Sequence, residues 1–187
     1  MLRLTNAFSN WTSGNSRLDQ FIQQTQLENP DSRFHMQWIN YDDFSDIKFV
    51  AKGGHSSVYS ATWLNKTDQV WDGVKQTFVE KPLVVALKVL KDSQNLSNEF
   101  LDEFMRHASL KLDGCVYTVH CHGVTRHPET QEYIMVMNYA EDGDLRQYLQ
   151  RHIDTLRWKD IVDILRDVAM GLLNIHKNKT YHKNLHC

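Results

Sequence analysis

An α+β fold is predicted by the order of the hydrophobic patterns along the chain. Short apolar stretches typical of strands and joined by turns occupy the middle of the chain, and the strongest helical pattern, 158–177, follows them. The central strand pattern, 84–90, has Lys88 in its middle. Burying an unpaired ammonium is costly, so Lys88 needs a carboxylate, an anionic ligand or water. For an isolated strand, an edge position with the lysine in water is the commoner outcome.

Composition points to one globular domain, or one domain with a tail, in a chain of 187 residues. The net charge of -2 creates no basic field, so nucleic acid is not an expected partner. The three cysteines form no disulfide framework and fit a reducing compartment. The N-terminus lacks the features of a signal peptide, and no apolar run is long enough to span a bilayer. A cytoplasmic or nuclear protein without membrane contact is therefore expected.

An N-terminal arm is predicted over residues 1–43. Capping residues at 13–16 precede apolar positions at near-helical spacing, and Asn29-Pro30 ends this pattern. The aromatic stretch 37–44 is expected to be extended, with one short turn. An extension that docks on the domain is favoured over a separate functional unit.

Several strands and turns are expected in the middle of the chain. Residues 47–63 are predicted to form a strand, a turn and a second strand. In the turn, Gly53-Gly54 frees the backbone to turn tightly and to approach a ligand closely. A polar loop is predicted over 64–81, and Pro82 opens the Lys88 strand. Stretches 116–124 and 133–139 are predicted to form a hairpin. The run His120-Cys121-His122 suggests a metal, but strand neighbours point to opposite faces and no second ligand cluster is visible, so no metal site is predicted.

Three helices are predicted after the Lys88 strand. In the first, 98–112, Glu103 borders the apolar stripe and could turn inward to meet Lys88, although a solvated acid is commoner. Asp144 is placed to cap a short helix over 145–151. The long helix 158–177 is amphipathic, and its small residues Ala169 and Gly171 are expected to allow close contact.

The order of these motifs resembles the protein kinase family, from the N-lobe to the start of the catalytic loop. Val85–Lys88 resembles the Val-Ala-Ile-Lys of the third strand, and Ala51–Val58 aligns with the glycine-rich loop. His182–Leu185 aligns with His-Arg-Asp-Leu. The chain is similar to tyrosine-kinase-like kinases, in particular to expanded kinase families of some soil fungi, through Trp11–Asn15 and Lys52–Gly54.

The resemblance implies a kinase N-lobe with hinge over 44–140, made of a five-stranded antiparallel sheet and a C-helix. Residues 141–187 would hold only the first helices of an α-helical C-lobe, truncated at the catalytic loop. Family members transfer a phosphoryl group from ATP to protein Ser/Thr or Tyr, with Mg²⁺.

The same resemblance implies a nucleotide site. Lys88 would pair with the α/β-phosphates of ATP and with Glu103, while Val58 and Ala86 would enclose the adenine ring. Met137 would be the gatekeeper, and Asp144 would contact the ribose. The main chain of Asn138 and Ala140 would form the hinge that binds adenine. The implied nucleotide-binding residues are Ala51, Lys52, Gly53, Gly54, His55, Ser56, Val58, Ala86, Lys88, Glu103, Met137, Asn138, Ala140 and Asp144.

Departures from the family pattern affect catalysis most. Ala51 and Ser56 replace two loop glycines, which stiffens the phosphate cradle. Near His182 of the catalytic loop, Asn184 replaces the aspartate base, and losing such a base costs roughly 10²–10⁴ in rate. The Mg²⁺ ligands of the family are absent from these 187 residues. ATP binding without turnover is therefore expected.

Three interpretations stay open. The chain belongs to an active kinase that continues past Cys187, or it is a non-catalytic pseudokinase that acts as a nucleotide-binding or scaffolding module. The third is a truncated paralogue fragment with no function of its own. An exposed apolar face on 158–177 marks a site for a protein partner or an aggregation liability.

Overall fold

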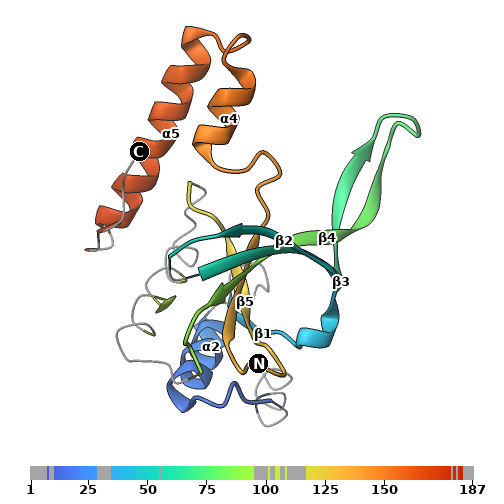
Figure 1. The fold of residues 1–187 in the computed structure, drawn as a ribbon, viewed down its shortest axis with the longest axis vertical. Helices are drawn as coiled ribbons and strands as arrows, with labels where there is room; N and C mark the ends of the chain where they lie inside the picture. The colour runs from blue at the N-terminus through green and yellow to red at the C-terminus, as the bar shows by residue number, and fades with distance from the viewer. Residues whose placement is uncertain are drawn as a thin grey trace.

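The computed structural model describes residues 8, 11–28, 35–54, 56–94, 101, 104–105, 108, 117–177, 179 and 181–182. A six-stranded sheet forms the centre of the molecule, with α2 at one end and α4 and α5 together at the other (Figure 1). Among the helices in these ranges, none combines the length and apolar character that a membrane span requires. The elements are α2 (Ser16–Glu28), β1 (Gln37–Trp38), η2 (Tyr41–Asp43), β2 (Phe44–Lys52), β3 (Ser56–Asp72), β4 (Thr77–Leu90), β5 (Cys121–Arg126), β6 (Tyr133–Asn138), α4 (Leu145–His152) and α5 (Trp158–Lys177).

The strand order is β1-β5-β6-β4-β3-β2, and each neighbouring pair except one is antiparallel. The exception is β1, which pairs in parallel with β5 through Gln37 and Gly123. The expected five-stranded antiparallel sheet is confirmed for β2 to β6, and the N-terminal arm adds a sixth strand in parallel. The absence of a side chain at Gly123 permits this pairing, since a Cβ there would lie 2.1 Å from the Gln37 carbonyl oxygen.

Residues 64–81 do not form the predicted polar loop, because β3 and β4 continue as a hairpin that projects from the sheet (Figure 1). We call this hairpin the β3–β4 arm. Pro82 lies inside β4 beside a register shift, rather than at its start. The tip is closed by Asp72, whose carboxylate accepts the backbone N–H groups of Val74 and Lys75. The predicted strand over 116–124 is also shorter than expected, because β5 begins at Cys121.

Both faces of the sheet carry a hydrophobic core. On one face, Leu90 and Met135 pack with α2 and with Leu101, Phe104 and Ala108. On the other face, the central strands β4 and β6 pack against the segment that contains Ile39 and Phe44. The described positions of the predicted helix 98–112 are helical, and Leu101, Phe104 and Ala108 of its predicted apolar stripe are buried, which confirms the prediction for these residues.

The arm predicted to dock on the domain is tied to β6. Asn15 begins α2 by accepting the backbone N–H groups of Arg17 and Leu18. The Tyr133 hydroxyl donates a hydrogen bond of 2.8 Å to the carbonyl oxygen of Ser13. Burial of Tyr133 raises the pKa of its phenol, so the hydroxyl remains a donor at neutral pH.

The two C-terminal helices begin and end close to their predicted bounds. Asp144 caps α4 as predicted, since its carboxylate accepts the Gln147 N–H at 2.8 Å. In α5, Gly171 is buried, and a Cβ there would lie 2.9 Å from the Tyr117 carbonyl oxygen. The close contact expected at small residues is thus confirmed for Gly171 and wrong for Ala169, which is exposed.

Candidate nucleotide site

Lys88 lies in the centre of the sheet. Its strand, β4, is flanked by β3 and β6, and Lys88 is partly buried opposite Val58 and Met135. The alternative of an edge strand with the lysine in water is therefore wrong. Residues directly opposite each other in antiparallel strands share a face, so these three side chains form one row across the sheet.

A second row runs parallel to the first. Ala86 lies opposite Ser60 and Met137, and it shares the face of Lys88 because it is two residues away on the same strand. Sheet register thus brings together four residues predicted for the nucleotide site: Val58, Ala86, Lys88 and Met137.

The same face of the sheet packs against the described residues of the predicted helix 98–112. Leu90, two residues beyond Lys88, packs with Leu101 and Phe104. Lys88 therefore points to the side of the sheet on which a C-helix acid could approach it. Glu103 lies outside the described residues, so its ion pair with Lys88 stays a prediction.

The glycine-containing turn between β2 and β3 is closed by a hydrogen bond of 2.8 Å from the Gly53 N–H to the Ser56 carbonyl. Neither Gly53 nor Gly54 has a positive φ, so the turn does not use the left-handed backbone conformation that favours glycine. A Cβ at Gly54 would meet no atom within 4 Å. Gly54 therefore leaves open space beside the backbone, whereas a Cβ at Gly53 would contact Ser56 at 3.6 Å. His55 lies outside the described residues.

Lys91 is a feature of the site that sequence reasoning missed. Its Nζ donates hydrogen bonds to the carbonyl oxygens of Gly53 at 3.3 Å and Gly54 at 3.1 Å. The contact ties the tip of the turn to the residue that follows β4. No local pattern signals it, because the partners are 37 and 38 positions apart.

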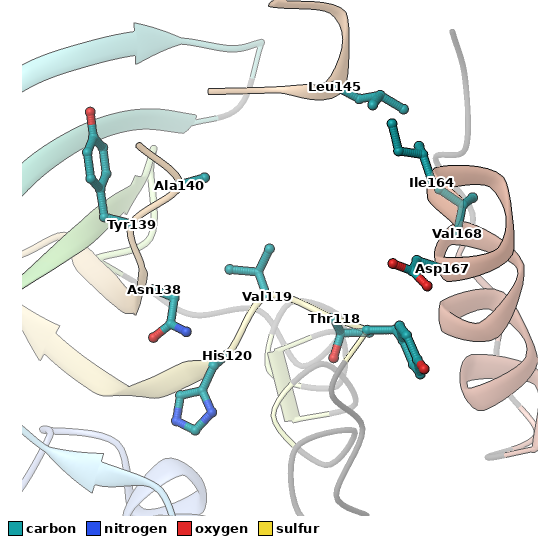
Figure 2. Close-up of a pocket in the computed structure, with 11 residues that line it drawn as sticks. Thr118, Val119, His120, Asn138, Tyr139, Ala140, Leu145, Ile164, Asp167 and Val168 are labelled. Atoms are coloured by element: carbon teal, nitrogen blue, oxygen red, sulfur yellow. The ribbon is translucent and has the colours of Figure 1, made fainter. Parts of the chain in front are cut away.

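The residues predicted for the hinge lie at a separate cavity of about 540 Å³ (Figure 2). Asn138 and Ala140 line it, and Figure 2 shows Ile164 and Val168 of α5 on its far side. Val58, Ala86 and Lys88 are not among its lining residues. Asp144, predicted to touch ribose, uses its carboxylate to cap α4.

Within the residues that the structure describes, no group of three or more His, Cys, Asp and Glu side chains could hold a metal ion. The His120 and His122 rings lie 4.5 Å apart between centroids. His122 Nε2 lies 2.8 Å from Asn138 Oδ1. His182 is exposed, and Asn184 lies outside the described residues.

Comparison with known proteins identifies the family. The model of the family described as protein tyrosine and serine/threonine kinase matches residues 45–187. Serine/threonine-protein kinase PLK4 of Aedes aegypti is 25% identical over 144 residues, covering 77% of this chain and 17% of the relative. Tyrosine-protein kinase SYK of Gallus gallus is 32% identical over 105 residues, covering 54% of this chain and 16% of the relative.

Tyrosine-protein kinase Fer of Rattus norvegicus is 26% identical over 150 residues, covering 80% of this chain and 16% of the relative. The chain thus spans about a sixth of the length of these curated relatives. Since the family model matches well over half of the residues, the chain belongs to the protein tyrosine and serine/threonine kinase family.

Proposed function

We propose that this chain binds ATP on the face of the sheet that carries Lys88 and, as a polypeptide of 187 residues, does not transfer the γ-phosphoryl group. In this proposal residues 44–140 form the N-lobe and hinge, 1–43 an arm and 141–187 the start of the C-lobe. The observation that supports ATP binding is the pair of rows that sets Lys88 beside Val58 and Ala86 on one face. An apolar platform next to a cation suits an adenine ring joined to phosphates.

Lys88 is the main phosphate-binding group in this proposal. The Gly53 N–H is already donated to Ser56, so the turn offers one backbone donor fewer than an open cradle. The open space at Gly54 leaves room for phosphate oxygens to approach the backbone. Mg²⁺, which the family uses, would screen the charge between these oxygens. Affinity should therefore depend strongly on the Lys88 ammonium.

ATP at ten times its Kd is expected to stabilise the chain by about 1.4 kcal/mol. This raises Tm by about 3–6 °C in a domain of this size. Lys88→Met should weaken binding by about tenfold or more, because a hydrogen bond to a charged group contributes about 1.5–3 kcal/mol. Thermal-shift titrations with Mg-ATP measure both values.

Lys81→Met is the matched control, since Lys81 is an exposed lysine on the same strand, within the β3–β4 arm. It should leave the ATP titration unchanged. Equal ATP stabilisation of the parent chain and the Lys88→Met variant would contradict a phosphate-binding role for Lys88.

No transfer of labelled γ-phosphate to the chain itself or to mixed Ser, Thr and Tyr substrates is expected from this polypeptide. Asn184 can hydrogen-bond a substrate hydroxyl but has no useful basicity, and the missing base alone lowers the rate by roughly 10²–10⁴. Filter-binding assays with labelled ATP check this. Incorporation that disappears in the Lys88→Met variant would refute it.

The alternative is an interaction module that works without nucleotide. It is favoured by α5, on which Val162, Leu165 and Val168 are exposed, Leu165 by 61%. A protein partner that covers the helix 158–177 would remove this apolar surface from water. The ATP titration separates the two functions, since an interaction module alone predicts no shift in Tm for the parent chain.

A further inference from the structure

A second cavity, of about 200 Å³, lies on the face of the sheet opposite Lys88. Leu87 and Val89 line it, and because they flank Lys88 in β4 their side chains point away from the nucleotide face. The cavity is smaller than a typical drug-sized pocket and suits a group about the size of one side chain. Its lining residues are Tyr41, Ile47, Tyr59, Leu87, Val89, His127, Thr130, Glu132 and Ile134.

The lining of the cavity is partly aliphatic and partly aromatic. Leu87 and Ile134 are each 1% exposed and belong to the core of this face. The rings of Tyr41 and His127 meet edge to face, with centroids 5.0 Å apart. Tyr59 adds a second phenol ring to the lining. A ligand with an aliphatic stem could pack this stem on the aliphatic residues and place a cationic group against the aromatic rings.

A fixed carboxylate supplies negative charge. Oε1 of Glu132 accepts the Asp92 N–H at 3.3 Å, and Oε2 accepts the Thr130 hydroxyl at 3.1 Å. These two contacts hold the carboxylate in place at the cavity while leaving further lone pairs for a ligand.

No cation of the lining balances that charge. His127 Nδ1 accepts the N–H groups of Glu129 and Thr130 at 3.2 Å each, so this ring nitrogen acts as an acceptor and is not available as a donor to Glu132. Among the nine lining residues that the structure describes, there is no lysine or arginine. Burial, and then the nearby Tyr59 and Glu129, raise the pKa of Tyr41, so its phenol stays neutral at physiological pH.

We propose that this cavity binds an alkylammonium group, a primary or methylated amine on a short aliphatic stem such as a lysine side chain. The aliphatic stem packs on Leu87 and Ile134, the ammonium lies against the rings of Tyr41 and Tyr59, and Glu132 accepts its hydrogen bond or neutralises its charge. The site is independent of the nucleotide face, so it stands whether or not the chain binds ATP.

The test is a titration of the full chain with n-butylammonium, followed by the methyl resonances of Leu87 and Ile134 in NMR spectra. Saturable shifts with a Kd in the millimolar range are expected for so small a ligand. Butan-1-ol, the neutral isostere, should bind about tenfold more weakly because it lacks the charge. The same titration of Nα-acetyl-lysine N-methylamide identifies the source: equal or tighter binding points to a protein lysine, and weaker binding points to a free amine.

Substitutions in the lining test whether the NMR shifts arise from binding at this cavity. Glu132→Gln and Tyr41→Leu should each weaken n-butylammonium binding by about threefold to fivefold. Lys81→Met, at an exposed lysine of the β3–β4 arm that does not line the cavity, should leave it unchanged, and dispersed amide spectra establish that each variant is folded. Equal binding of butan-1-ol, unchanged binding by folded Glu132→Gln protein, or the absence of saturable shifts would each overturn the proposal.

Discussion

Ile22→Ala is expected to lower the free energy of unfolding by about 2–5 kcal/mol. Ile22 is 0% exposed and lies in α2, within the N-terminal arm. It belongs to the same core cluster as Leu101 and Phe104. The substitution removes buried methyl and methylene groups and leaves a cavity that the surrounding side chains only partly fill. A loss of this size would mean that the arm is an integral part of the core.

Gln20→Ala is the control for this experiment, because Gln20 is an exposed residue of the same helix. Its effect should stay within about 0.5 kcal/mol. Urea unfolding followed by far-UV circular dichroism measures both variants. If Ile22→Ala matched Gln20→Ala, α2 would not contribute to the stability of the sheet.

Gly123→Ala is the second large effect, with an expected loss of about 1–3 kcal/mol or more. The added Cβ would lie 2.1 Å from the carbonyl oxygen and 2.9 Å from the carbonyl carbon of Gln37. Both are backbone atoms, which cannot rotate away as the end of a side chain can. Strand β1 must therefore move off β5, and the parallel pairing of Gln37 with Gly123 is lost.

Gly73→Ala is the matched glycine control, because a Cβ at Gly73 would meet no atom within 4 Å. It should change stability by no more than about 0.5 kcal/mol in the same urea experiment. Hydrogen exchange adds a local measure: the Ile39 N–H, which bonds to the Val124 carbonyl, should exchange faster in Gly123→Ala. Unchanged protection at Ile39 together with unchanged stability would contradict the close approach of β1.

Two features of the sheet were not predicted from the sequence, and each has a specific physical reason. The β3–β4 arm looked like a loop because its residues are mostly polar and Pro82 suggested a strand start. Val70 of β3 and Val79 of β4 lie directly opposite each other in this hairpin. That relation is visible only when the two strands are paired. Strand β1 is only 2 residues long, too short to carry a periodic pattern, and depends on a glycine far away in the sequence.

Local patterns within the sequence were sufficient for the helices α2 and α5, the strand around Lys88, the Asp144 cap and the kinase resemblance. The elements and the cap depend on spacings of a few residues, which propensity, periodicity and capping encode directly. The resemblance depends on the order of short motifs along the chain. Glu103, His55 and Asn184 were assigned roles by the same resemblance, and those roles stay predictions.

Only the tertiary structure decided which side chains share a face. The register of β4 with β3 and β6 sets Lys88 beside Val58 on one side and sends Leu87 to the other. The contact of Lys91 with the glycine turn and the cavity around Glu132 likewise join segments that are distant in the chain. Such relations depend on strand order and pairing, and a shift of one residue in register would reverse them.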